Sequence, residues 1–388
     1  MPKLIKTALI SLFLVIYSGN TFAPSKGRAV IDVVFCLDLS GSTNGLLDDV
    51  REKLWEIVNQ VNSYRPAPEF RIGVIGFSRP SFGAKFSYVK VLQPLTTDFD
   101  LLNFELYKLK PSVEKGDQIV GEALKTAIRN MNWSGESDAL KVIYLVGNGM
   151  VNAGGDNYRE ACEQATRKNI VINTVYCRTR NNVDKELPGW REIARLAGGE
   201  QFDIRIHKRA PLVITSPNTI EFRELAGRLS ETYIYYGANG NERYKMMASV
   251  DNHARLANEM TFESRLFYKI SDRYQFHQQY WDLVDYLKMS NSDFADLEMK
   301  YLNDSLKFKS PADVREITSQ MKDKRSRLVM ELRKHMPYDR QAYINKRMED
   351  RDIDKADMFD RVVINSLNAM ATAKGFSTGN ASSIEFRR

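Results

Sequence analysis

The feature that most constrains the fold is an alternation, between residues 29 and 206, of short apolar runs with segments whose apolar residues recur at helical spacing. Strands are predicted at 29–37, 70–77, 86–92, 142–146, 170–176 and 201–206. Helices are predicted at 46–61, 99–109, 120–131, 157–168, 190–197 and 220–229. Because helices between successive strands make crossover connections, we expect a doubly wound, mostly parallel, Rossmann-like α/β sheet with helices on both faces. Such sheets bind ligands at the carboxyl ends of their strands.

A different pattern begins after residue 206. A proline-containing connection over 207–217 and one more predicted helix lead to the loop Gly237-Ala238-Asn239-Gly240, and no strand-like run follows it. We therefore expect a first domain over 27–237, an all-α helical module over 241–374 and a flexible tail over 375–388. Within the module, helices are predicted in 241–289, 311–335, 341–348 and 358–370. Its charged helices favour a scaffold, partner-binding or self-association role.

The N-terminus has the layout of a secretory signal peptide. Lys3 and Lys6 precede an apolar run over 8–17, and the small residue Ala23 ends the segment. Because the apolar run is shorter than the ~20 residues that a membrane-spanning helix needs, we favour cleavage after Ala23 over a membrane anchor. Residues 1–23 are thus predicted to be removed. We expect the mature chain to have no transmembrane segment and to be secreted or periplasmic.

Composition narrows the class of partner. The net charge is +7, but basic residues are interleaved with acidic ones, so nucleic-acid binding is not expected. Cys36, Cys162 and Cys177 are an odd number of cysteines, and we interpret them as buried small side chains rather than as a disulfide framework. No spacing of cysteine and histidine indicates a zinc site.

Polar side chains cluster where the first predicted strand ends. Asp38, Ser40 and Ser42 alternate there, just before a predicted helix. One such residue could cap the helix, but three oxygen donors exceed what a cap requires and suit a hard cation such as Mg²⁺, Ca²⁺ or Mn²⁺. A serine nucleophile is disfavoured because neither serine lies in G-x-S-x-G and no histidine precedes His207. A phosphate loop is disfavoured because residues 41–45 lack the lysine of a P-loop.

The motif Asp38-Leu39-Ser40-Gly41-Ser42, closing a buried strand, resembles the metal-ion-dependent adhesion site of von Willebrand factor A (VWA) domains. The order of the predicted elements agrees with that family, which implies two further metal-site loops. In the second loop, here 115–120, Asp117 is the favoured ligand and Gln118 the alternative, since the family's usual threonine is absent. In the third loop Asn148 stands where the family has an aspartate, which implies a weaker site. The implied metal ligands are Asp38, Ser40, Ser42, Asp117 and Asn148.

The resemblance also implies a function. In this family the metal keeps one coordination position open for an Asp or Glu carboxylate of a protein partner, and no catalysis is involved. The segments 176–178, 189–202 and 232–237 are similar to those of a group of exported bacterial VWA proteins. We therefore expect an exported, non-enzymatic adhesion or scaffold protein that uses Mg²⁺, or Ca²⁺ or Mn²⁺, at this site. The alternative is a structural or assembly factor of the cell envelope whose VWA domain is degenerate and independent of metal.

Overall fold

A computed structural model describes most of the chain from residue 29 onward. The described residues are 29–110, 114, 119–152, 157–178, 183–205, 218–288, 294, 297–350 and 358–379. The predicted signal peptide over 1–23, Asp117 and Gln118 lie outside these residues.

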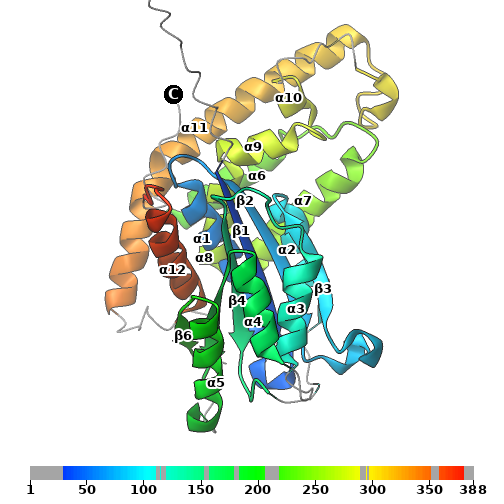
Figure 1. Ribbon diagram of the computed structural model, residues 1–388. Helices are drawn as coiled ribbons and strands as arrows, with labels where there is room; N and C mark the ends of the chain where they lie inside the picture. Colours follow the sequence, from blue (N-terminus) through cyan, green and yellow to red (C-terminus); the bar gives the residue numbers. More distant parts are fainter. Residues whose placement is uncertain are drawn as a thin grey trace, which may run out of the picture.

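A six-stranded, mostly parallel sheet forms the centre of the fold (Figure 1). The strands are β1 Val30–Asp38, β2 Glu69–Phe77, β3 Lys90–Thr96, β4 Leu140–Gly147, β5 Ile170–Cys177 and β6 Gln201–Ile204. Their spatial order is β3-β2-β1-β4-β5-β6; β3 pairs antiparallel with β2, and the other neighbours pair in parallel. β1 is buried along its whole length, which is why its sequence is a continuous apolar run.

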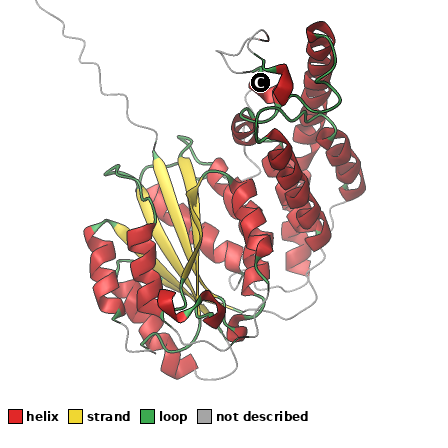
Figure 2. Cartoon of the chain, turned by 90° about the vertical axis from the view of Figure 1, so that its right-hand side faces the viewer, coloured by secondary structure: helices red, strands yellow, loops and turns green. Residues whose placement is uncertain are grey.

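Helices cover both faces of this sheet, as Figure 2 shows from the side. One face packs against α3 Val120–Asn130, α4 Tyr158–Arg167 and α5 Val183–Leu196, and the other against α1 Leu46–Asn62 and α2 Phe99–Lys108. Successive residues of β1 divide between the two faces, with Val34 on the first and Phe35 on the second. The predicted doubly wound α/β fold is therefore confirmed.

The predicted bounds of one strand are wrong. The run 86–92 was expected to be a strand, but Ala84–Phe86 forms a 3₁₀ turn, and β3 starts later, at Lys90. The backbone of Ser87 and Tyr88 has positive φ, at 50° and 58°. This left-handed conformation is incompatible with a strand, so it delays the start of β3.

The C-terminal region is helical, as predicted, but its helices divide differently. They are α6 Thr219–Ser230, α7 Gly240–Ala257, α8 Glu259–Lys269, α9 Asp272–Gln278, α10 Leu283–Tyr286, α11 Pro311–Asp350 and α12 Phe359–Ala373. The stretch 241–289 is interrupted because the side chains of Asn258, Ser271 and Asp282 accept backbone N–H groups and so cap α8, α9 and α10. The helices predicted at 311–335 and 341–348 are instead one helix, α11.

The C-terminal helices α7, α8 and α12 pack directly on the sheet domain. α12 lies beside α1 (Figure 1), where the rings of Phe359 and Phe35 are 5.7 Å apart. α8 also packs on α1, and the rings of Tyr268 and Trp55 stack at 5.5 Å. The helical region predicted as a module thus shares the hydrophobic core of the sheet.

The chain remains packed beyond residue 375, where a flexible tail was predicted. The ring of Phe376 lies 6.2 Å from the ring of Tyr64, at the end of α1. Ser377 forms a backbone bridge with Arg65, in which each residue's N–H donates to the other's carbonyl. Residues 380–388 lie outside the described residues.

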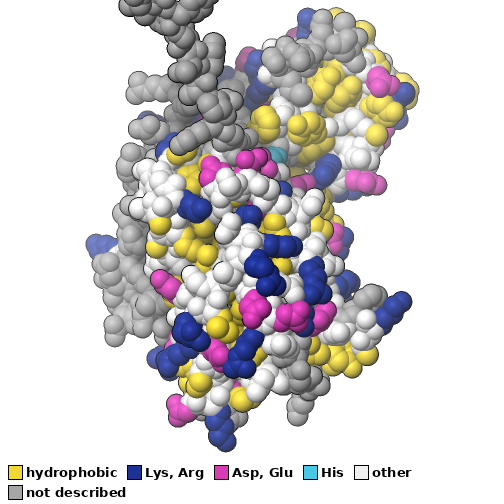
Figure 3. Space-filling model, in the orientation of Figure 1, with side chains coloured by type: hydrophobic (Ala, Val, Ile, Leu, Met, Phe, Trp, Pro, Cys, Tyr) yellow, Lys and Arg dark blue, Asp and Glu magenta, His cyan; other side chains and the backbone are white. Residues whose placement is uncertain are grey.

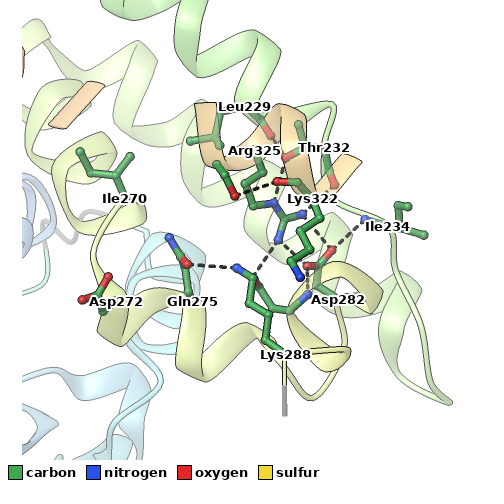
Figure 4. A network of polar contacts seen from close by, with 12 residues as sticks. Leu229, Thr232, Ile234, Ile270, Asp272, Gln275, Asp282, Lys288, Lys322 and Arg325 are labelled. Atoms are coloured by element: carbon green, nitrogen blue, oxygen red, sulfur yellow. Dashed lines mark hydrogen bonds and ion pairs between the residues drawn. The ribbon is translucent and has the colours of Figure 1, made fainter. Parts of the chain in front are cut away.

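A buried arginine of α11 joins this helix to the segment after α6 and to the start of α10 (Figure 4). Arg325 donates to the carboxylates of Asp282 at 2.6 Å and Asp285 at 2.8 Å, and to the carbonyl of Thr232 at 2.6 Å. Burial by itself would lower the pKa of Arg325, but the two carboxylates outweigh this effect and raise it. The guanidinium therefore stays charged and fixes the long helix.

The three cysteines are buried and form no disulfide, in agreement with their interpretation as small core side chains. Burial raises the pKa of the Cys162 thiol to about 12. Such thiols are poor nucleophiles and poor metal ligands at neutral pH.

Charges of both signs share the described surface. Figure 3 shows basic and acidic side chains close together over α3 and α4, where Lys125 pairs with Glu160 at 3.5 Å and Arg159 with Glu192 at 2.8 Å. Among the described helices, none combines the length and apolar character that crossing a lipid bilayer requires.

Candidate metal-binding site

The loop after β1 folds back on itself at the carboxyl edge of the sheet. Asp38, the last residue of β1, is fully buried, and its Oδ1 accepts the backbone N–H of Ser40 at 2.9 Å. The Thr43 hydroxyl lies 2.7 Å from the carbonyl oxygen of Asp38 and 3.0 Å from that of Ser40. These contacts hold 38–43 as a compact turn before α1 and fix the positions of its hydroxyl groups.

The structure brings Asn148, which directly follows β4, to this turn. The Ser42 hydroxyl donates to Oδ1 of Asn148 at 2.9 Å, and the Ser40 and Ser42 hydroxyl oxygens are 2.8 Å apart. Because a hydroxyl has one proton and that of Ser42 is used on Asn148, Ser40 is the donor to Ser42. Three of the five predicted ligands therefore form one hydrogen-bonded chain, next to Asp38 in the same turn.

A glycine at the end of β4 allows this close approach. A Cβ added at Gly147 would lie only 2.5 Å from the Cβ of Asp38 and 3.2 Å from the ring of Trp190. Any side chain at this position would push β1 and β4 apart at the edge where the polar groups meet. The glycine thus brings Asp38 and Asn148 together on neighbouring strands.

The donor set suits a hard divalent cation. A carboxylate, two hydroxyls and an amide oxygen are all oxygen ligands, the type that Mg²⁺, Ca²⁺ and Mn²⁺ prefer. Within the part of the chain that the structure describes, no group of three His, Cys, Asp or Glu side chains could hold a metal. Three of the four described candidates here are hydroxyl or amide oxygens instead. The residues present therefore fit a hydroxyl-rich cation site rather than a carboxylate-rich one.

Nucleophilic catalysis has little support at this site. The described hydroxyl partners of Ser40 and Ser42 are each other and Asn148, with no histidine among them. The backbone carbonyl of Cys177 accepts a hydrogen bond from Nδ2 of Asn148 at 3.5 Å. Cys177 is buried, and burial together with the charge of Asp38 holds the pKa of its thiol well above the ordinary value. Among the described residues, neither kind of nucleophile has a partner that would activate it.

Glu186 is a neighbouring residue that the sequence did not reveal. Its Oε2 accepts the backbone N–H of Gly149 at 2.8 Å and the hydroxyl of Tyr176 at 2.7 Å. It therefore places a carboxylate directly behind the Asn148 loop. A helix was predicted only from residue 190, because Pro188 interrupts the helical pattern, but α5 starts at Val183 and includes this proline. Starting that helix two turns earlier would have placed Glu186 on it, but the contact with Gly149 also depends on how the helix packs.

Basic side chains stand on the other side of the turn. A small cleft beside Ser40 is lined in part by Arg79 and Lys110. Arg79 donates to the carbonyl of Lys110 at 3.0 Å and pairs with Glu114 at 3.5 Å. The carbonyl of Glu114 in turn accepts the N–H of Gly41 at 2.8 Å. The chain just before the second predicted loop therefore contacts the metal-site turn directly.

Comparison with solved structures gives distant matches. Proximal thread matrix protein 1 from the mussel byssus is 17% identical over 46% of this chain and 42% of that chain, with a TM-score of 0.36. An aerotolerance-related membrane protein from Bacteroides fragilis is 18% identical over 45% of this chain and 91% of that chain, with a TM-score of 0.32. A von Willebrand factor type A protein from Catenulispora acidiphila is 14% identical over 46% and 39%, with a TM-score of 0.34. No curated protein matches the chain.

A family comparison identifies the sheet domain. The model of the von Willebrand factor type A domain matches residues 32–196. The matched region runs from β1 to the end of α5 and includes the turn at Asp38 and the loop at Asn148. The doubly wound sheet agrees with this match, so residues 32–196 of the chain form a von Willebrand factor type A domain, to which the C-terminal helices are added.

Proposed function

We propose that the VWA domain binds an acidic protein partner through a divalent cation at the turn after β1. The observation that carries the proposal is the convergence of the Ser40, Ser42 and Asn148 oxygens beside the buried Asp38. Asp117 is the proposed fifth ligand. Its loop follows Glu114, which is hydrogen-bonded to Gly41 of the same turn.

The residues around the site have different roles in this proposal. Asp38 supplies the negative charge, and Ser40, Ser42 and Asn148 offer neutral oxygens once the hydroxyl protons turn away from their present acceptors. The cation, when bound, provides a coordination position for an Asp or Glu carboxylate of the partner. Arg79 and Lys110 lie beside Ser40 and favour a partner whose surface is acidic.

The charge that Asn148 lacks is supplied in part by Glu186. Glu186 contacts the N–H of Gly149, the residue after Asn148. Groups behind the ligands of a metal typically change its affinity by about 10–100-fold. Because the ligands are oxygens, we propose Mg²⁺ as the resident ion, with Ca²⁺ and Mn²⁺ as alternatives. Zn²⁺ belongs in the same comparison, because the site of the mussel protein is described as zinc-occupied.

Metal-dependent stability tests this function. A cation that binds only the folded state raises the melting temperature by mass action. We expect Mg²⁺, Ca²⁺, Mn²⁺ or Zn²⁺ to raise the melting temperature of EDTA-treated protein, and the Ser40→Ala/Ser42→Ala double variant to lose this rise. Ser305→Ala is the matched control, because Ser305 is exposed in the C-terminal region and its hydroxyl donates to Asn303.

The opposite result has a clear meaning. If no ion changes the melting temperature of the native protein, the metal-dependent function is excluded. The alternative hypothesis, a cell-envelope factor whose VWA domain does not need a metal, would then be favoured. We also propose that the protein is exported, and this proposal rests on the sequence of residues 1–23 alone. The intact mass of protein isolated from the producing cells, if it still included these residues, would contradict export by cleavage.

A further inference from the structure

A cavity of about 280 Å³ lies between α6, α7 and α8, outside the matched VWA region. Each helix presents one face to it at helical spacing, such as Ala226 and Ser230 of α6, Met247 and Asp251 of α7, and Phe262 and Leu266 of α8. An apolar cavity of roughly 150 Å³ can hold a benzene ring. This one therefore has room for a small organic molecule.

Small residues keep the cavity open. Gly227 and Ala226 line it from α6 and Ala248 lines it from α7. A Cβ added at Gly227 would meet no heavy atom within 4 Å. Gly227 is exposed, so it lines the cavity where the cavity opens to solvent. Met247, Phe262 and Leu266 supply apolar walls.

The polar groups deep in the cavity balance one another. Nε of Arg265 donates to Asp251 at 2.9 Å, and Lys269 forms an ion pair with the other oxygen of Asp251. Arg265 also pairs with Asp100 at 2.6 Å, so two cations face two carboxylates. Burial would raise the pKa of Asp251, but Lys269 and Arg265 lower it. This cluster is neutral overall and demands no charged ligand.

An excess positive charge lies at the end of the cavity near the α7–α8 junction. Arg223 is already paired with Glu259, which accepts its Nε at 3.1 Å, and its guanidinium lies 5.2 Å from the ring of Phe262. Arg255, in the last turn of α7, is exposed and donates to the side-chain oxygen of Asn252 at 2.9 Å. No carboxylate in the described part of the chain forms an ion pair with Arg255. The rim therefore carries one uncompensated cation beside apolar walls.

We propose that this cavity binds a small amphipathic anion, with the apolar body between α6, α7 and α8 and a carboxylate at Arg255. Apolar walls provide the binding energy through burial, and the single guanidinium selects a negatively charged head. The volume is just below the roughly 300–1,000 Å³ of common ligand pockets. The chemistry therefore fits a medium-chain fatty acid better than a large lipid.

Calorimetric titration of the full chain with decanoate, below its micelle-forming concentration, tests the proposal. We expect saturable binding of decanoate, weaker binding of decanol, which lacks the charge, and no binding of decylamine, whose charge is opposite. Absence of saturable decanoate binding would overturn the proposal. Equal affinities for the three compounds would overturn the role of the guanidinium and, with it, the proposed ligand class.

Variants locate the ligand. Arg255→Ala is expected to weaken decanoate binding about tenfold, because it removes the guanidinium that the carboxylate would pair with. Gly227→Leu fills open space without a clash at Cβ and is expected to abolish binding while the protein stays folded, as circular dichroism would check. Arg228→Ala is the matched control, because Arg228 is exposed on α6 and does not line the cavity. Decanoate binding that survives both Arg255→Ala and Gly227→Leu would place the ligand elsewhere and refute the proposal.

Discussion

Gly147 and Gly227 have opposite surroundings, so substituting each of them tests how tightly the chain packs around a single residue. An alanine at Gly147 would place its Cβ 2.5 Å from the Cβ of Asp38, whereas one at Gly227 would meet nothing within 4 Å. We expect Gly147→Ala to lower the free energy of unfolding by about 1–3 kcal/mol, as overpacking does. Gly227→Ala should raise it by about 0.5–1 kcal/mol, because alanine is the better helix former.

Urea denaturation of both variants beside the native protein measures this difference. Equal stability of Gly147→Ala and the native chain would mean that β1 and β4 can separate freely at this edge. The interpretation of Gly147 as the residue that lets Asp38 and Asn148 approach would then be wrong.

The sequence predicted part of the candidate site for a physical reason. Asp38, Ser40 and Ser42 are close in sequence and follow a buried strand, so their proximity depends on local structure alone. Asn148 could be added because neighbouring parallel strands end at the same edge of a sheet. Glu186 could not be identified in this way, since its contact with Gly149 depends on the start of α5 and on how that helix packs.

At the scale of elements, α12 supports the sheet from the far end of the chain. Leu367 of α12 is fully buried in the core that also contains Phe35 and Tyr144. We expect Leu367→Ala to cost about 2–5 kcal/mol of the free energy of unfolding, as truncation of a buried leucine does. Asn365→Ala, on the exposed side of the same helix, should stay within about 0.5 kcal/mol of the native protein.

Chemical denaturation followed by tryptophan fluorescence can report this effect at the sheet domain, because Trp55 lies in α1 and Trp190 in α5. If Leu367→Ala left the unfolding of the sheet domain unchanged, α12 would be a separate unit rather than part of its core.

The position of α12 shows why element types were easier to predict than their packing. The apolar residues of 358–370 predicted a helix correctly, because helical spacing is a local property. Which surface that helix covers depends on contacts between residues more than 200 positions apart, such as Ser366 with Tyr144. An apolar helix face fits many apolar surfaces, so the sequence favoured a helical module and did not reveal its contact with the sheet.

At the scale of the whole molecule, charged groups tie the C-terminal helices to the sheet domain. Arg265 of α8 binds Asp100 of α2 and Asp251 of α7, and its guanidinium lies 4.6 Å from the ring of Trp55 in α1. Within the C-terminal region, Arg325 of α11 forms buried ion pairs with Asp282 and Asp285. Because breaking a buried pair costs about 3–5 kcal/mol, local opening of one helix is costly. Changes at one interface should therefore act on the stability of the whole chain.

The interface of α1 with α12 gives that stability a pH dependence. The pKa of Asp49 is raised to about 7, first by burial and then by the neighbouring carboxylates Glu52, Asp360 and Asp48, while Lys53 opposes the shift. One oxygen of the buried Asp360 has no hydrogen-bond partner among the described residues. Negative charge at this interface is therefore poorly compensated.

The sign of the effect follows from proton binding. The ordinary pKa of Asp49 is 3.8, so between about pH 4 and pH 7 the folded state binds more protons than the unfolded state, and the free energy of unfolding falls as pH rises. Asp49→Asn removes this term. We expect the variant to be more stable than the native protein at pH 8 by roughly 1–4 kcal/mol, since one pKa unit corresponds to about 1.4 kcal/mol. At pH 4 the gain should vanish. Urea denaturation at both pH values measures it, and an equal gain at pH 4 would show that the carboxylate charge is not its cause.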